Sequence, residues 1–212
     1  MEMINGKLLE CLLSIFFHFF LFITMKGYNI FFFIPLLFLL LSLHACTSKS
    51  KKDMEYVKGW HGKKISLPSE SDFLLFGRDS VVYDYSSFPY KIVLVIGKEQ
   101  CISCKFDVAK WQELIQQVDS ITSFKVGFVF VLEPIYQHDV YVMLRSHQFM
   151  TPVFIDTNNT FRSMNKISDN DSHVWLLDSN NRIIYIGDPT VNQKINKEYM
   201  ELVRTNYLFN DK

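Results

Sequence analysis

The sequence is poor in cysteine and carries no excess charge of either sign, and each shortage excludes a class of protein. Only four of its 212 residues are cysteine, too few for a disulfide-framework protein, which needs several bridges between distant segments. The formal net charge is +0, whereas nucleic-acid-binding proteins show a basic excess on some segment. The basic cluster KSKK at residues 49–52 is better explained as a solvated tether beside anionic headgroups, so no nucleic-acid partner is expected. The sequence also lacks internal repeats, a phosphate-binding glycine loop and a Ser-His-Asp pattern.

Apolar residues, in contrast, fill almost the whole chain before Cys46. A run of this kind is either a membrane span or an export signal. Lys26 supplies a positive charge just after Met25, residues 30–41 form an apolar core, and LHAC places a small residue directly before a cysteine. This pattern resembles the signal of bacterial lipoproteins, in which cleavage before the cysteine leaves a thiol that carries diacylglycerol. We therefore expect residues 25–45 to be a signal peptide and Cys46 to be the lipid-bearing residue, in contact with membrane lipid.

The apolar residues 1–24 need a separate explanation, because a lipoprotein signal needs no second apolar block before it. We favour Met25 as the biological start, with an over-extended reading frame upstream. The alternative is a hairpin of two membrane helices with Glu10 inside the first, although a carboxylate within a membrane is costly without a partner. Residues 46–58 follow as a polar tether, and residues 59–212 have the length of one domain.

Two cysteines remain for chemistry, because Cys11 is absent if Met25 is the start and Cys46 carries lipid. These are Cys101 and Cys104, one helical turn apart where an apolar run gives way to an amphipathic pattern. A cysteine at a helix N-terminus meets free N–H groups and the positive end of the helix dipole, which lower its pKa. We therefore expect Cys101 to be the nucleophile and Cys104, shielded one turn further in, to be the resolving thiol. Lys105 adds a positive field.

The remaining pattern predicts alternating strands and helices. Turn residues punctuate short apolar stretches over residues 59–90, which indicates β-hairpin structure. Runs of β-branched residues predict buried strands, helical spacing of apolar residues predicts helices, and two apolar stretches around Asp178 predict a second hairpin. The expected elements are strands at 91–97, 124–133 and 152–157, helices from about 101 to 118, 135–149 and 191–208, and a hairpin at 173–189. Such βαβαβ alternation implies a parallel sheet.

From Ile92 to about Leu208 the chain resembles thioredoxin-like domains of the TlpA/ResA and peroxiredoxin-related type. The resemblance is carried by three segments, W.GK.I.LP from Trp60, C.SCK from Cys101 and D..N.I...GDP from Asp178. It implies an α/β thioredoxin-like fold, with a central mixed sheet flanked by helices and a β-rich N-terminal extension. It also implies a thiol-disulfide oxidoreductase of the bacterial cell envelope, facing the periplasm or cell exterior. Such an enzyme needs no cofactor, acts on protein disulfides and is kept reduced by a membrane thiol donor.

One departure from thioredoxins concerns the proline that normally faces the cysteine pair in a cis peptide bond. If HVWLLD is the strand that follows it, Ser172 occupies that position, and a cis bond there would cost about 2.5–4 kcal/mol. We therefore expect a trans bond and altered substrate recognition, with Pro152 opening a strand. The alternative register makes Thr151–Pro152 the cis bond.

Two other functions remain open from the residues alone. The cysteine pair could be an inert disulfide on a redox-inactive binding or scaffold lipoprotein. It could also supply half of a copper-delivery site, with His138, His147 or His173 as the further ligand, although the cysteines in such proteins are spaced CxxxC. No resident metal site is expected, since a zinc site would usually show a second ligand pair.

Overall fold

Two parallel strands form the centre of the sheet in the computed structural model, which describes residues 54–122, 126–168 and 172–210. β3 (Tyr90–Ile96) pairs in parallel with β4 (Val126–Leu132), and β6 (His173–Leu177) pairs antiparallel to β3 on its other side. The strand order is β2-β1-β5-β4-β3-β6-β7. The predicted α/β architecture with a mixed central sheet is thus confirmed, and residues Trp60–Lys212 form one structural unit.

The β-rich N-terminal extension extends this sheet. β1 (Phe73–Leu75) and β2 (Asp79–Val81) form an antiparallel hairpin after the short helix η2 (Glu70–Asp72), and β1 pairs with β5 (Val153–Ile155). The extension also contacts the other edge of the sheet. There the backbone of Lys64 forms an isolated antiparallel β-bridge with Arg182, the residue just before β7 (Ile183–Ile186). The hairpin structure predicted between residues 59 and 90 is therefore confirmed.

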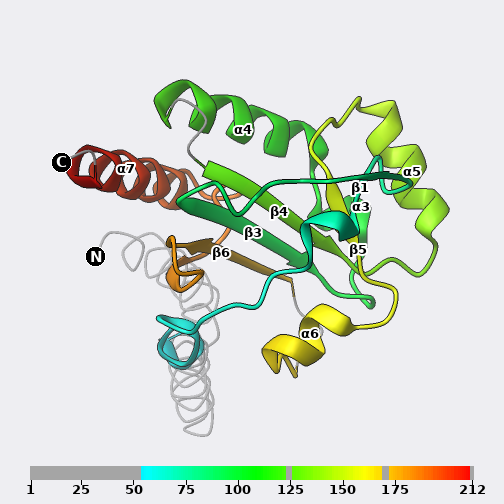
Figure 1. Cartoon of the computed structure of the whole chain (residues 1–212), viewed down its shortest axis with the longest axis horizontal. Coiled ribbons are helices and arrows are strands. Elements are labelled where there is room, and N and C mark those ends of the chain that lie inside the picture. Colours follow the sequence, from blue (N-terminus) through cyan, green and yellow to red (C-terminus); the bar gives the residue numbers. More distant parts are fainter. Residues whose placement is uncertain (1–53, 123–125, 169–171, 211–212) are drawn as a thin grey trace, which may run out of the picture. The chain divides into compact units, whose positions relative to one another are not determined.

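Helices cover both faces of the sheet (Figure 1). α4 (Val108–Thr122) and α7 (Gln193–Asn210) pack on one face, and α6 (Thr160–Asn165) lies on the other. α5 (Gln137–Ser146) lies beyond β4 in the chain and contributes Val140 to the core. Alternate β3 residues point into the core that α4 and α7 cover, because successive side chains of a strand face opposite sides; these are Tyr90, Ile92, Leu94 and Ile96.

The helix predicted to begin near Cys101 is in fact two helices. α3 (Ile102–Lys105) ends after four residues, and α4 starts only at Val108. The cause is Phe106, which is 1% exposed because it turns into the core. Asp107 then starts the new helix: its carbonyl accepts from the Trp111 N–H at 3.0 Å and its carboxylate from the Lys110 N–H at 3.3 Å.

The register around the second hairpin agrees with the favoured prediction. β6 pairs antiparallel with both β3 and β7, and Pro152 directly precedes β5, which lies parallel to β4. Among the described residues no peptide bond is cis, so the alternative register, with a cis bond at Thr151–Pro152, is wrong.

Two helical segments were not predicted, namely α6 and residues 54–60. The latter overlap the end of the expected tether.

The expected start at Met25, the signal peptide and the lipid-bearing Cys46 lie outside the described residues. Within the part that the structure describes, none of the helices combines the length and the apolar character needed to cross a membrane.

Gly127 marks a place where β4 is packed too closely for a side chain. A Cβ atom there would lie 2.9 Å from Phe88 Cδ2 and 3.2 Å from Cγ. Gly127 is paired with Lys91 of β3, and the N–H of the next residue, Phe128, donates to the Tyr83 hydroxyl at 3.2 Å, so the backbone has little freedom to move away. Gly127→Ala should therefore lower the free energy of unfolding by about 1–3 kcal/mol, as measured by urea denaturation. Gly59→Ala is the matched control, since nothing lies within 4 Å of the position that its Cβ would take; equal unfolding midpoints for the two variants would contradict the packing at Phe88.

Candidate functional site

The two cysteines lie at the carboxyl edge of the central parallel strands. β3 ends at Ile96, and residues 97–100 form a turn in which the Gln100 N–H donates to the Gly97 carbonyl at 2.9 Å. Cys101 follows this turn directly. Open α/β sheets place their reactive groups at the carboxyl ends of strands, so the position is one at which chemistry is expected.

Cys101 and Cys104 are joined by a disulfide, with Cα atoms 5.2 Å apart. Cys101 is the N-cap of α3, and its sulfur accepts a hydrogen bond from the Cys104 N–H at 3.2 Å. The Ser103 hydroxyl lies 3.5 Å from the same sulfur. The predicted place of Cys101 at the start of a helix is confirmed. Because α3 has only four residues, it cannot carry the dipole of a long helix. The group that can stabilise a negative charge on the Cys101 sulfur is therefore the Cys104 N–H.

Both cysteines are exposed, so the expectation that Cys104 is shielded is wrong. The reason lies in the helix break: the chain turns inward only at Phe106, two residues beyond Cys104. Within α3, the residue that packs against the core is Ile102. Neither cysteine residue is enclosed by the core.

Ser172 lies where the sequence placed it, directly before β6. His173, the first residue of β6, pairs with Val95 near the carboxyl end of β3, which brings Ser172 to the edge that carries the cysteine pair. Its hydroxyl oxygen is buried and has no hydrogen-bond partner among the described residues. Lys105, the other predicted supporting residue, is exposed and forms no ion pair within the described part of the chain.

The three candidate copper ligands are not brought together. His138 lies on α5 and His147 at its C-terminal end, both exposed, whereas His173 is 3% exposed and stacks on Trp175 with ring centroids 5.2 Å apart. No group of three His, Cys, Asp or Glu residues able to hold a metal ion occurs in residues 54–122, 126–168 and 172–210. The described residues thus offer no assembled copper site.

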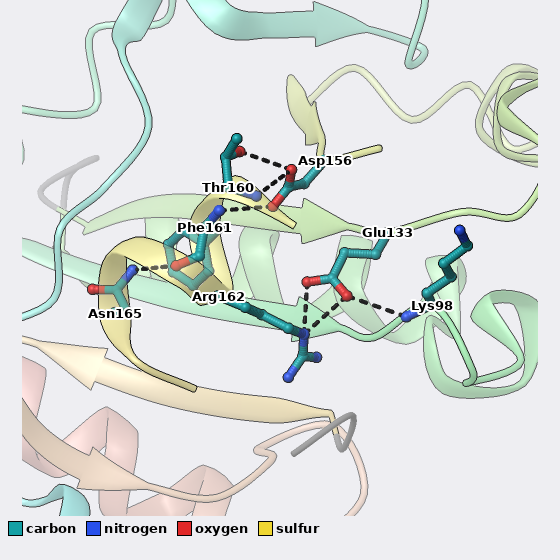
Figure 2. A network of polar contacts seen from close by, with 7 residues as sticks. All are labelled: Lys98, Glu133, Asp156, Thr160, Phe161, Arg162 and Asn165. Atoms are coloured by element: carbon teal, nitrogen blue, oxygen red, sulfur yellow. Dashed lines mark hydrogen bonds and ion pairs between the residues drawn. The ribbon is translucent and has the colours of Figure 1, made fainter. Parts of the chain in front are cut away.

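A buried ion pair beside the cysteine turn was missed by the sequence analysis. Glu133 follows β4 and is 1% exposed, and Arg162 of α6 is 4% exposed. The Arg162 Nε–H lies 2.7 and 2.9 Å from the two carboxylate oxygens, and the Lys98 backbone N–H donates to Oε2 at 3.2 Å (Figure 2). The signal that could have indicated Glu133 is a single carboxylate ending an otherwise apolar strand, VGFVFVLE. No comparable signal marked Arg162.

Known proteins resemble this chain in structure but not in sequence. No family profile and no curated protein matches it. The peroxidoxin BcpB of Mycobacterium tuberculosis is similar with a TM-score of 0.50 and 6% identity, over 69% of this chain and 97% of that one. A thioredoxin-like protein in the oxidized form (TM-score 0.46, 11% identity, 69% and 97% covered) and a thiol:disulfide interchange protein of Chlorobium tepidum TLS (0.45, 12%, 66% and 98%) are also similar. Together with the strand order, the first of these similarities shows a thioredoxin-like fold.

The exposure of both cysteines makes a direct prediction about their reactivity. Dithiothreitol should open the disulfide without denaturant, and iodoacetamide should then modify Cys101 and Cys104 in the native protein, because both residues are exposed. Peptide mass spectrometry would count the adducts. Modification of both residues only after addition of guanidinium would show that the pair is buried and would contradict the geometry.

Proposed function

We propose that this chain is a lipid-anchored thiol-disulfide oxidoreductase of the bacterial cell envelope, working through Cys101 and Cys104. The observation that supports the proposal most directly is an exposed disulfide at the carboxyl edge of a thioredoxin-like sheet, with a backbone N–H aimed at one of its two sulfurs. An inert structural disulfide would need neither the exposure nor the N–H contact.

The contact with the Cys104 N–H assigns different roles to the two cysteines. A hydrogen bond to a charged acceptor is roughly twice as strong as one to a neutral acceptor, so this N–H favours the thiolate over the thiol at Cys101. The thiolate is the nucleophilic form of cysteine. Cys101 is therefore the attacking residue, and Cys104, one turn along α3, is the resolving residue.

The reaction proceeds as two exchanges. The Cys101 thiolate attacks one sulfur of a substrate disulfide, forms a mixed disulfide and releases the other substrate sulfur as a thiolate. Cys104, as a thiolate after losing its proton to solvent, attacks the Cys101 sulfur, which forms the Cys101–Cys104 disulfide and releases the second substrate thiolate. The substrate gains two electrons and the protein loses two. A membrane thiol donor then returns two electrons and restores both thiols.

The sequence pattern supports the proposed location and the proposed class of substrate. A signal of the lipoprotein type before Cys46 favours export and anchoring to membrane lipid, and protein disulfides form and persist outside the cytosol. We accordingly propose envelope proteins with disulfides as the substrates. Ser172 stands where thioredoxins present a proline, and its hydroxyl is buried without a hydrogen-bond partner among the described residues, so the backbone that faces a substrate here is not shaped by a proline ring.

Insulin reduction tests the proposed activity. The wild-type protein should catalyse it, and Cys101→Ser should lower the rate to that of the uncatalysed reaction because the nucleophile is lost. Cys104→Ser should instead accumulate mixed disulfides at Cys101, visible as a mass increase that dithiothreitol removes. Ser120→Ala, at an exposed position of α4 outside the motif, is the control and should keep the activity.

Absence of turnover in the wild-type protein, together with no mixed disulfide in Cys104→Ser, would favour the redox-inactive binding protein instead.

The anchor is tested separately. Cys46→Ala should release the protein from bacterial membranes into the soluble fraction, since a lipid chain is added only to the cysteine. Fractionation followed by immunoblotting would measure the release. Unchanged retention in the membrane fraction would indicate that the apolar residues 1–24 hold the protein instead.

A further inference from the structure

Glu133 contacts the segment that carries Cys101 in two ways. Its backbone N–H donates to the Ile96 carbonyl at 3.1 Å, and its carboxylate accepts from the Lys98 N–H at 3.2 Å. Both contacts fall between the last residue of β3 and the turn at residues 97–100. The Glu133 side chain, at the end of β4, therefore holds the Lys98 N–H near the start of the turn that follows β3.

The carboxylate that holds the turn is itself oriented by Arg162. The Nε–H of Arg162 lies within 2.9 Å of both Glu133 oxygens, and both side chains are buried. A buried ion pair is a weak source of stability, since apolar residues of similar volume often replace one at no cost. An apolar pair at these two positions, however, could not accept a hydrogen bond from the Lys98 N–H. Accepting this hydrogen bond is therefore the property that distinguishes Glu133 from an apolar residue of similar volume.

Arg162 is in turn fixed by helix α6, which is fastened at both ends. Asp156, directly after β5, accepts from the N–H groups of Thr160 and Phe161 at 2.9 and 2.8 Å. At the other end, the side chain of Asn165 bonds both the N–H and the carbonyl of Ser66, at 2.7 and 2.9 Å. Figure 2 shows the guanidinium of Arg162 reaching from α6 to the Glu133 carboxylate.

We propose that Glu133, oriented by Arg162, is a positioning residue for the reaction. It fixes the turn at residues 97–100 and so keeps the Cys101 sulfur beside the Cys104 N–H. The inference rests on the proposed function for its catalytic meaning, but the placement of the sulfur is a property of the protein alone. An ion pair carries no net charge, so its field falls quickly with distance, and its effect on Cys101 passes through the Lys98 hydrogen bond.

Two double variants separate this hydrogen bond from the ion pair. Replacing Glu133 alone would take the carboxylate from a buried guanidinium, which is strongly destabilising, so Arg162→Met is present in both. Glu133→Gln with Arg162→Met keeps an amide oxygen that can accept from the Lys98 N–H, whereas Glu133→Leu with Arg162→Met keeps no acceptor. Far-ultraviolet circular dichroism would establish that both variants are folded.

The measurement is the pH dependence of Cys101 alkylation by iodoacetamide in the reduced protein, with the adduct located by peptide fragmentation. The Leu variant should show a thiol pKa higher by about one unit, a tenfold change in the ionisation constant, because the sulfur loses its fixed N–H neighbour. The Gln variant should keep the wild-type pKa. Hydrogen exchange at the Lys98 amide should be fast in the Leu variant and slow in the Gln variant.

Three outcomes would overturn the positioning role. Equal pKa values in all three proteins would show that the Lys98 contact does not place Cys101, and equal shifts in both variants would show that the ion pair acts through its charges. Unchanged Lys98 exchange in the Leu variant would show that the hydrogen bond is not formed. None of these readouts requires a substrate, so a wild-type protein that fails to reduce insulin would refute the proposed function and leave this test intact.

Discussion

The hydrogen bond from the Cys104 N–H to the Cys101 sulfur is the contact on which the proposed chemistry of this chain depends. It exists because the chain leaves β3 through a short turn and places Cys101 as the N-cap of α3, so that the Cys104 N–H points back toward the Cys101 sulfur. The N-cap is the position whose side chain accepts a hydrogen bond from an N–H of the first helical turn. The sheet edge, the turn and the one-turn helix thus act together to distinguish two cysteines that are otherwise both exposed.

Packing in the core of the domain sets the length of the helix α3 that begins after Cys101. Phe106 packs against Phe130 and Phe149, with ring centroids 5.1 and 5.3 Å away, and its burial forces the helix to break. The cysteine pair consequently lies on a short external turn, while the long helix α4 covers the sheet with Trp111 fully buried. Packing explains both the stability of the helix face and the exposure of Cys104.

The features predictable from the sequence were those that depend on neighbouring residues. Continuous β-branched runs indicated β3 and β4, the apolar stretches around Asp178 indicated the hairpin of β6 and β7, and the CxxC spacing indicated the redox motif. The break between α3 and α4 was not predictable from the spacing of apolar residues. Val108 and Trp111 fit the helical pattern whether one helix runs from Cys101 or a second helix starts at Val108. The burial of Phe106, which only the fold shows, distinguishes the two cases. Glu133 and Arg162 are 29 residues apart, and a pairing at that separation depends on the fold rather than on any local pattern.

The most direct test of the central claim is the pKa of the Cys101 thiol in the reduced wild-type protein, followed through the chemical shift of its β-carbon in a pH titration. Stabilisation of the thiolate by the Cys104 N–H predicts a value clearly below the ordinary cysteine pKa of about 8.5, and a lower value than that of Cys104. A Cys101 pKa at or above the ordinary value, or above that of Cys104, would contradict the assignment of Cys101 as the nucleophile.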